Sequence, residues 1–497
     1  MENRNIYNRH LFFGLIVVLL ISAGAFLIKY NDFKNGRGVE NIQATYHALL
    51  TINSLSSLPL SESMLLPTVN FNSYMDKNIP WAAAVKTIDG NYVYTSFPSL
   101  GFALPYALLR IVGANLNISD LFFVNSLFLF FAIVFFFSSI YLHLIKIGIP
   151  SLPSVLASIA GSSVMLFASE SLISSGLIYW PQSLSQMLLA IILFIFSARK
   201  NNISNLSDFF LFVLLTAFSM TEWTGYVFGA CLFFYSSITK HEGWKRICLL
   251  CFFSSLLAVL VFFVQITSVL DLNAFFNTSI ERFGVRGAAK ADFTKLIKGY
   301  WISFGLFLVF IIPALYYLRD ARHRFIIILC MLPMAENIIL ASHAISFTFD
   351  RWKLAFPIGM AIAITVAELK KISFTVIIIA IGASIFGVHQ YNQKVNIYTH
   401  WSEANIKNKE LAYKASKVTD FRCANIYSDT RVRGYTVMLF KRGVTEGIPK
   451  SPKDILHNDP SRCSVVIIRS AMPTPDIPEI HEIEVWNRDE SQPHRFN

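Results

Sequence analysis

Apolar blocks of about 18–25 residues follow one another along most of this sequence, and they restrict its fold more than any other feature. A block of this length crosses roughly 30 Å of hydrocarbon as a helix. Helices are expected because the bilayer offers no water to pair with backbone groups. Only 15% of the 497 residues are charged, against roughly 25% in soluble domains. The pattern therefore predicts an α-helical polytopic membrane protein.

About eleven spans are expected from a 19-residue hydropathy window. They lie near residues 11–28, 121–144, 152–169, 177–197, 207–221, 224–238, 246–268, 300–318, 324–341, 354–369 and 372–389. The stretch 207–238 is ambiguous, because SMTEWTG at its centre fits either a tight turn between two short spans or one broken helix. With two spans there and a cytoplasmic N-terminus, every inside loop carries a basic residue, as the positive-inside rule requires.

The net charge of +11 is explained by these basic loops, so no nucleic-acid partner is inferred. The first span is too long for a typical cleaved signal and is expected to be a retained anchor in the plasma membrane, the inner membrane of a bacterium. It is followed by a polar loop over 29–120, which is expected outside the cytoplasm. The tail over 391–497 falls on the same side. The chain would thus divide into a membrane domain, 1–390, and an extracytoplasmic domain, 391–497.

The tail alternates polar segments with short apolar runs, which indicates a small α/β domain. Strand-like runs occupy 423–428, 435–440, 463–470 and 482–487, after a helix-like stretch at 405–418. Cys423 and Cys463 would be able to form a disulfide if this tail lies outside the cytoplasm, and otherwise would stay free thiols.

The first loop contains two amphipathic segments. Residues 38–54 carry apolar side chains at helical spacing, with Glu40 in the expected first turn, where the helix dipole favours a carboxylate. Residues 98–113 form the second segment, with Pro98 at its start. Both are expected to lie as helices in the membrane interface.

This arrangement resembles the GT-C class of membrane glycosyltransferases, which includes the protein mannosyltransferases and the bacterial aminoarabinose transferases. The resemblance rests on an N-terminal anchor, a large outside loop, Val39-Glu40 in place of the usual paired acids, and Tyr94-Thr-Ser-Phe-Pro98-Ser-Leu100 in place of Tyr-Pro-Pro-Leu. It implies a GT-C-like fold and transfer of a sugar from a polyprenyl-phosphate carrier to a lipid, glycan or protein acceptor at the outer face. It leaves the need for a divalent metal open, and no metal ligands are identified.

Such a transfer needs a general base for the acceptor hydroxyl. Glu40 matches the family position best, and Asp76 in MDKNIPW is the second candidate. For Asp76 the alternative is a turn-forming aspartate, and for Glu40 a simple helix-start charge. Tyr94 is the candidate for a substrate contact in the same loop.

Cations are needed to stabilise a phosphate leaving group. Arg282 and Arg286 are four residues apart and would share a helix face, with Lys290 close behind them. The alternative for each is a solvated loop near lipid headgroups. The segment 342–353 adds three further candidates and one acid to the outer surface. They are His343, Arg351 and Lys353, with Asp350 beside them; snorkelling at the interface is their alternative role.

Three acids lie at or within the apolar blocks: Glu170, Glu222 and Glu336. Ionisable groups at such depth are costly and usually face a cavity. Glu222 and Glu170 would stand at the outside ends of their spans, where Glu222 is a candidate substrate contact. A structural ion pair is the alternative for all three.

Two other classes of function compete with a glycosyltransferase. One is a transporter or flippase for envelope glycans, and the other a polymerase or ligase of surface polysaccharide. Transporters usually carry their charges at the centre of the membrane on broken helices, whereas most charges here lie at the outer end of the spans.

Overall fold

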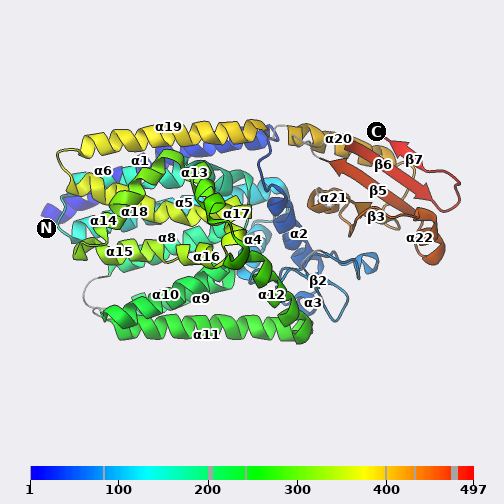
Figure 1. Ribbon diagram of the computed structural model, residues 1–497, viewed down its shortest axis with the longest axis horizontal. Coiled ribbons are helices and arrows are strands. Elements are labelled where there is room, and N and C mark those ends of the chain that lie inside the picture. The colour runs from blue at the N-terminus through cyan, green and yellow to red at the C-terminus, as the bar shows by residue number, and fades with distance from the viewer. Residues whose placement is uncertain are drawn as a thin grey trace. The chain divides into compact units, whose positions relative to one another are not determined.

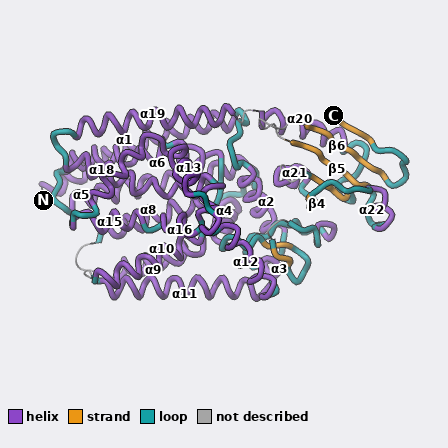
Figure 2. Tube along the Cα trace, viewed as in Figure 1, coloured by secondary structure: helices purple, strands orange, loops and turns teal. Residues whose placement is uncertain are grey.

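The computed structural model describes residues 2–81, 84–199, 205–240, 243–397, 400–429, 433–471 and 480–497. Two compact units share these residues. The first, called here the helical unit, consists of Met1–Asn31, Phe122–Phe263 and Glu281–Lys394. The second, the mixed unit, consists of Asp32–Leu121, Val264–Ile280 and Val395–Asn497. In the described part of the chain all strands belong to the mixed unit (Figure 2).

The helical unit is a bundle of long helices joined by short ones (Figure 1). Its long helices are α1 (Glu2–Lys34), α5 (Ile118–Lys146), α6 (Ser151–Phe167), α8 (Gln182–Ala198), α9 (Asn205–Thr221), α10 (Trp223–Thr239), α11 (Trp244–Val269), α13 (Phe293–Phe304), α15 (Ala321–Met331), α18 (Ala355–Glu368) and α19 (Ser373–Ile397). Its short elements are α7 (Ser169–Leu172), η2 (Ile173–Leu177), η3 (Ala288–Lys290), η4 (Gly305–Phe310), α14 (Ile311–Tyr317), α16 (Met334–Ile339), α17 (Ala341–Ser346) and η5 (Thr348–Leu354). Helix α12 (Leu272–Arg286) is divided between the units, and one end of each of α1, α5, α11 and α19 also belongs to the mixed unit.

Five helical segments in the described residues are long and apolar enough to cross a membrane. A sixth is counted if the 65° bend between α6 and Ser169–Leu177 lies within one span. Their outer faces expose large apolar side chains, such as Leu20 (69%), Phe252 (54%) and Phe374 (74%). Such a surface is stable against lipid but not against water. The chain is a multi-pass membrane protein; each expected span contains helix, and the number eleven stays a prediction.

The chain breaks at Glu222, between two predicted spans, and at Pro333, inside one of them. Helices α9 and α10 form a hairpin around Glu222, so the chain reverses there rather than continuing as one helix. The reversal is tight: a Cβ on Gly225 would lie 2.3 Å from the carbonyl carbon of Phe218. The range 324–341 is also not one helix, because α15 ends before Pro333 and α16 begins after it. Proline ends a helix because its ring clashes with the preceding turn.

The centre of the helical unit is the contact between α6 and α18. A Cβ on Gly161 would lie 2.5 Å from the carbonyl oxygen of Gly359, and the reverse distance is also 2.5 Å. Small residues let two membrane helices approach until their backbones touch. Helix α18 is accordingly buried along almost its whole length.

The mixed unit joins the first loop to the tail. Its elements are α2 (Gln43–Ser57), α3 (Leu60–Ser63), η1 (Tyr74–Asp76), β1 (Val85–Lys86), β2 (Tyr92–Val93), α4 (Leu100–Ile111), α20 (His400–Ala415), β3 (Asn425–Ser428), α21 (Arg433–Phe440), β4 (Thr445–Glu446), α22 (Pro452–Asn458), β5 (Ser464–Ala471), β6 (Ile480–Asn487) and β7 (His494–Phe496). Strands β1 and β2 form an antiparallel hairpin. One hydrophobic core contains Leu50 and Val69 of the loop together with Val466 of the tail.

The tail strands form one sheet in the order β4-β3-β5-β6-β7. Strand β3 is parallel to β4 and β5, and β6 is antiparallel to β5 and β7. Alternate residues of β5 enter different cores: Val466 and Ile468 face one, Val465 and Ile467 the other. A strand covered on both faces reads as an unbroken apolar run, which is why β5 was predictable.

One predicted strand is a helix. Residues 435–440 (YTVMLF) have strand composition, but they belong to α21, which packs on α2. The rings of Tyr46 and Tyr435 meet edge to face with centroids 5.3 Å apart. Packing of this face therefore outweighs intrinsic propensity. Of the two alternatives left open for Cys423 and Cys463, the structure has the disulfide.

Removal of the disulfide is expected to destabilise the mixed unit. The two cysteines are 40 residues apart, and a loop of that length stabilises by about 4 kcal/mol in the chain-entropy model. We expect the Cys423→Ser/Cys463→Ser protein to be cut by protease in the tail at much lower denaturant concentration. Cys231→Ala, a change of a free thiol, should leave the digestion unchanged. Equal resistance of the double variant and the parent would contradict the prediction.

Candidate functional site

Seven polar residues form a buried cluster in the helical unit, which we call the acid–lysine cluster. They are Gln182, Glu222, Glu336, Asn337, His343, Asp350 and Lys353, and none is more than 7% exposed. They come from the start of α8, the α9–α10 turn, α16, α17 and η5. Gln182 and Glu222 stand at helix starts, and the other five belong to helices of six or seven residues. In helices this short most backbone groups need partners outside the helix.

Lys353 is the cation of the cluster. Its ammonium pairs with Glu336 and lies 3.5 Å from Oε1 of Glu222. It also donates to Oδ1 of Asn337 at 3.4 Å. Glu336 accepts a second hydrogen bond from the hydroxyl of Thr224. A buried ammonium is stable only when its three donors are matched in this way.

Gln182 links two carboxylates of the cluster. Its Nε2 donates to Oε1 of Glu222 and to Oδ1 of Asp350, each at 2.6 Å. The other oxygen of Asp350 pairs with Nδ1 of His343. Asn337 completes this side by donating to the Asp350 carbonyl at 3.0 Å and to the Tyr300 hydroxyl at 2.7 Å.

The cluster has more acceptors than donors. Oε2 of Glu222 is buried and finds no hydrogen-bond partner in the described part of the chain. Burial raises the pKa of Glu222 to about 8, against the opposing effect of the Lys353 ammonium. Burial would also raise the pKa of Asp350, but the His343 ring and Lys353 together hold it below its usual range. The pKa of Glu222 is therefore raised while that of Asp350 is lowered, so the two groups lose their protons in different pH ranges.

Arg351 extends the polar contacts beyond the cluster. Its Nε donates to the Ser303 hydroxyl at 3.0 Å, and its Nη1 donates to the Ala344 carbonyl at 2.8 Å. The Ser303 hydroxyl in turn lies 3.1 Å from Oε2 of Glu170. Glu170 thus reaches Arg351 through Ser303, whereas Glu222 belongs to the acid–lysine cluster itself.

The short helix η5 explains how three charged residues within four positions reach their partners. In a 3₁₀ helix successive side chains point about 120° apart. Asp350 and Lys353 are three residues apart and therefore share the face that meets the acid–lysine cluster. Arg351 contacts Ser303 instead, and Trp352 donates to the Ser171 hydroxyl at 3.0 Å. Phe349 anchors the turn by stacking with Phe347, with ring centroids 5.4 Å apart.

Three residues predicted to contact substrate lie together in the cluster: Glu222, His343 and Lys353. Lys353 contacts Glu222 directly, and Asp350 and Gln182 connect His343 to Glu222. Arg351 is next in the chain, and the charge of Arg286 acts on Asp350. Arg282 and Arg286 are both half-buried on α12, while residues 283–285 between them are exposed. That pattern fits the shared face expected for them. The side chain of Lys290 lies outside the described residues.

The remaining predicted site residues belong to the mixed unit. Glu40 is exposed in the turn before α2, which begins at Gln43, so its predicted place in the first helical turn is wrong. The helix starts later because Asn41 adopts a left-handed conformation, with φ of 64°. Tyr94 is half-buried, with its ring 4.5 Å from that of His47.

Asp76 is fully buried in an ion pair. Its Oδ1 accepts from Nε of Arg442 at 2.8 Å and from the backbone N–H of Gly443 at 3.0 Å. Arg442 is itself only 6% exposed. This geometry gives Asp76 a clear structural role that joins η1 of the first loop to the tail.

Sequence reasoning left out Gln182, Asn337 and Tyr300 and saw no partner for Glu336. The depth of Glu336 in an apolar block was a usable signal. Amides and phenols carry no comparable signal, because they are common at helix ends without any site. Among the described residues, no group of three or more His, Cys, Asp or Glu side chains is arranged to hold a metal ion.

Solved structures show where this fold occurs. No protein-family model matches the sequence, and no curated protein is similar to it in sequence. ArnT from Cupriavidus metallidurans, in a structure bound to undecaprenyl phosphate, is similar over 91% of this chain and 93% of its own, with a TM-score of 0.61 and 11% identity. The oligosaccharyltransferase AglB from Archaeoglobus fulgidus, in complex with an inhibitory peptide and a dolichol-phosphate, is similar over 91% of this chain and 69% of its own, with a TM-score of 0.52 and 11% identity. The expected GT-C-like fold is thereby confirmed, and at this identity the likeness establishes the fold alone.

Loss of the buried ammonium should destabilise the helical unit. Lys353→Met leaves the Glu336 and Glu222 carboxylates without their cation, and breaking a buried pair in this way costs about 3–5 kcal/mol. Adding Glu336→Gln should recover part of the loss, because one buried charge is removed. Thermal unfolding in nanodiscs measures both, with Lys371→Met at an exposed position as the control. Strictly additive effects would show that the two residues do not interact.

The raised pKa of Glu222 predicts a pH-dependent stability. The folded state binds this proton more tightly than the unfolded state, whose pKa is about 4.5. The free energy of unfolding that this proton contributes is fully present below about pH 4.5 and is lost as the pH rises toward 8. We expect the unfolding temperature to fall between roughly pH 5 and pH 8, and Glu222→Gln to make this fall smaller. Glu281→Gln, at an exposed position, should follow the parent; an unchanged profile in Glu222→Gln would contradict the assignment.

Proposed function

We propose that this chain is a membrane glycosyltransferase that moves a sugar from a polyprenyl-phosphate carrier to an acceptor. The observation that carries the proposal is the fold likeness to ArnT bound to undecaprenyl phosphate, which extends over nine-tenths of both chains. AglB, which shares the fold, was solved with dolichol-phosphate. Both neighbours therefore hold a long isoprenoid phosphate, and the apolar helices of this chain suit the same class of carrier.

The proposed orientation has the N-terminus in the cytoplasm of a bacterial inner membrane and transfer at the outer face. Lys146, Arg199 and Arg246 lie at helix ends that this topology places inside. The Cys423–Cys463 disulfide supports an extracytoplasmic tail, since disulfides persist in oxidising compartments. In this proposal residues 1–390 form the membrane domain and 391–497 the extracytoplasmic domain.

Glu40 is the proposed general base. Its exposed carboxylate is available to take the proton of an acceptor hydroxyl as that oxygen bonds to the anomeric carbon. The bond from the anomeric carbon to the phosphate oxygen breaks in the same displacement, and the electron pair leaves with the carrier phosphate. Asp76 suits this role poorly, because Arg442 and Gly443 already occupy its Oδ1.

The leaving phosphate requires cations, and we assign this role to Arg282 and Arg286, which share a face of α12. Lys290, His343 and Arg351 are assigned supporting contacts to the carrier. Lys353 is assigned a positioning role, because its ammonium is already matched by Glu336 and Glu222. Tyr94 is assigned to a sugar or acceptor contact, since aromatic rings pack well on pyranose faces.

A transporter or flippase for envelope glycans is the alternative from another class, and a polymerase or ligase is the third. The proposed base and phosphate contacts, Glu40, Arg282 and Arg286, come from the turn before α2 and from α12 rather than from broken spans, which favours an enzyme. Transport of carrier-linked sugar without any transfer would favour the flippase.

Substitution of the two candidate bases tests the proposal. The full chain is reconstituted with a panel of polyprenyl-phosphate sugars and envelope extract as acceptor, and release of polyprenyl phosphate is followed by mass spectrometry. Glu40→Gln should lower release by about 10²–10⁴-fold, the usual contribution of a general base. Asp76→Asn should lower the unfolding temperature but keep turnover per folded molecule, since its pair is structural.

Asp89→Asn is the matched control, because Asp89 is another exposed carboxylate of the first loop. Full activity in Glu40→Gln together with loss in Asp76→Asn would transfer the base assignment to Asp76. Absence of any polyprenyl phosphate release by the parent protein across the panel would contradict the glycosyltransferase proposal itself.

A further inference from the structure

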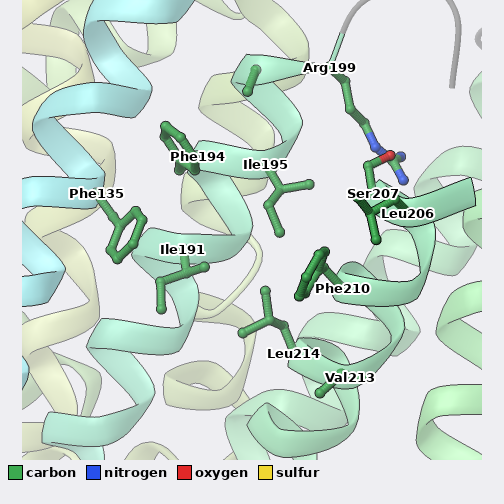
Figure 3. A pocket seen from close by; sticks show the side chains of 11 residues that line it. Phe135, Ile191, Phe194, Ile195, Arg199, Leu206, Ser207, Phe210, Val213 and Leu214 are labelled. Atoms are coloured by element: carbon green, nitrogen blue, oxygen red, sulfur yellow. The ribbon is translucent and has the colours of Figure 1, made fainter. Parts of the chain in front are cut away.

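A groove of about 650 Å³ opens between α5, α8 and α9 in the helical unit. Nine of its eleven lining residues are apolar, and the other two, Arg199 and Ser207, stand together at one end (Figure 3). Leu206, Phe210 and Val213 on its rim are 45–65% exposed. The volume lies in the range of about 300–1,000 Å³ that is typical of ligand pockets.

The polar end of the groove carries an excess of positive charge. Asp208 pairs with Arg199 and, at 2.7 Å, with Nε of Arg246. Lys146 donates to the carbonyl of Arg199 at 2.9 Å and brings a third cation to the same place. Among the described residues, three cations and one carboxylate thus gather at this end of the groove.

Arg199 is the residue that points to a ligand. Its side chain is only 10% exposed, yet its Nε is buried with no hydrogen-bond partner in the described part of the chain. A buried guanidinium donor without an acceptor is destabilising, because it has lost its water and gained no partner. An anion at the end of the groove would supply the missing acceptor.

The depth of the groove fits a membrane lipid. Helix α8 begins at Gln182 of the acid–lysine cluster, and Arg199 follows its last residue. The 17 positions between the two residues correspond to a distance of about 25 Å along the helix, at 1.5 Å per residue. The charged end is therefore separated from the cluster by most of the thickness of a bilayer core. It stands at the opposite membrane interface from the polar region that the proposed function uses.

We propose that this groove is a binding site for an anionic glycerophospholipid of the leaflet at that interface. One acyl chain lies along the apolar walls formed by Ile191, Phe194 and Leu214, and the phosphate accepts hydrogen bonds from Arg199 and Arg246. A zwitterionic lipid fits the walls equally well, but its ammonium group would face the surplus cations. The site does not depend on the glycosyltransferase proposal, because neither Glu40 nor the acid–lysine cluster takes part.

Native mass spectrometry of the full chain, released from detergent micelles, tests the site with two probes. Palmitoyl-oleoyl phosphatidylglycerol should bind about tenfold more tightly than the matching phosphatidylcholine, because each cation near a headgroup contributes about 1 kcal/mol. Arg246→Gln should weaken phosphatidylglycerol binding about fivefold on the same basis. Arg246 is 45% exposed, so the variant is expected to fold. Lys245→Gln, an equal charge change next to it, should alter binding less than twofold.

A second pair of variants tests the apolar walls. Val213→Trp fills the groove from its exposed rim and should abolish phosphatidylglycerol binding. Val259→Trp places the same ring on an equally exposed part of α11 outside the groove and should leave binding intact. Equal affinity for the two lipids, or equal effects within either variant pair, would overturn the proposal. Displacement of phosphatidylglycerol by a tenth as much undecaprenyl phosphate would also overturn it, since the groove would then belong to the carrier.

Discussion

A lysine buried to 2% exposure among three carboxylates is the interaction on which the helical unit depends. An ammonium group in an apolar bundle is tolerated only when anions surround it. Glu222, Glu336 and Asp350 arrive from three separate places in the chain, so this requirement fixes the α9–α10 turn, α16 and η5 against one another. The apolar helices alone would not specify such a register, because lipid-facing surfaces pack with little directional preference. The polar cluster therefore supplies the specificity, and close packing of α6 on α18 supplies the contact area.

The mixed unit uses the same principle at a smaller scale. Asp76 and Arg442 are 366 residues apart in sequence, and both are almost completely buried. Their pair makes the first loop and the tail into one body with a shared hydrophobic core. The loop is thus better described as part of a folded domain than as an insertion between spans. A consequence for Glu40 is that it projects from a folded domain, even though it lies in a turn.

The sequence predicted the features that depend on periodicity and composition. The apolar blocks gave the helices, the unbroken run at 464–471 gave the central strand β5, and the spacing of Arg282 and Arg286 gave their common face. Features that depend on partners distant in sequence were not predictable. Residues 435–440 became a helix because Tyr435 packs on Tyr46, and Glu336 had no visible partner because Lys353 follows it by a turn, a helix and a second turn. Gln182 could not be predicted as a site residue, because its role depends on Glu222 and Asp350, which meet its amide only in the folded chain.

The disulfide constrains the first loop as well as the sheet that contains it. The chain between Cys423 and Cys463 includes both α21 and β4, and from it come the arginines that hold the first loop. Arg433 donates to the carbonyl of Pro80, and Arg462 donates to the carbonyl of Met75 at 3.0 Å. The disulfide thus closes a covalent ring of the chain, and two arginines of that ring hydrogen-bond the first loop. Reduction of the disulfide would therefore loosen the segment that carries Asp76 as well as the sheet.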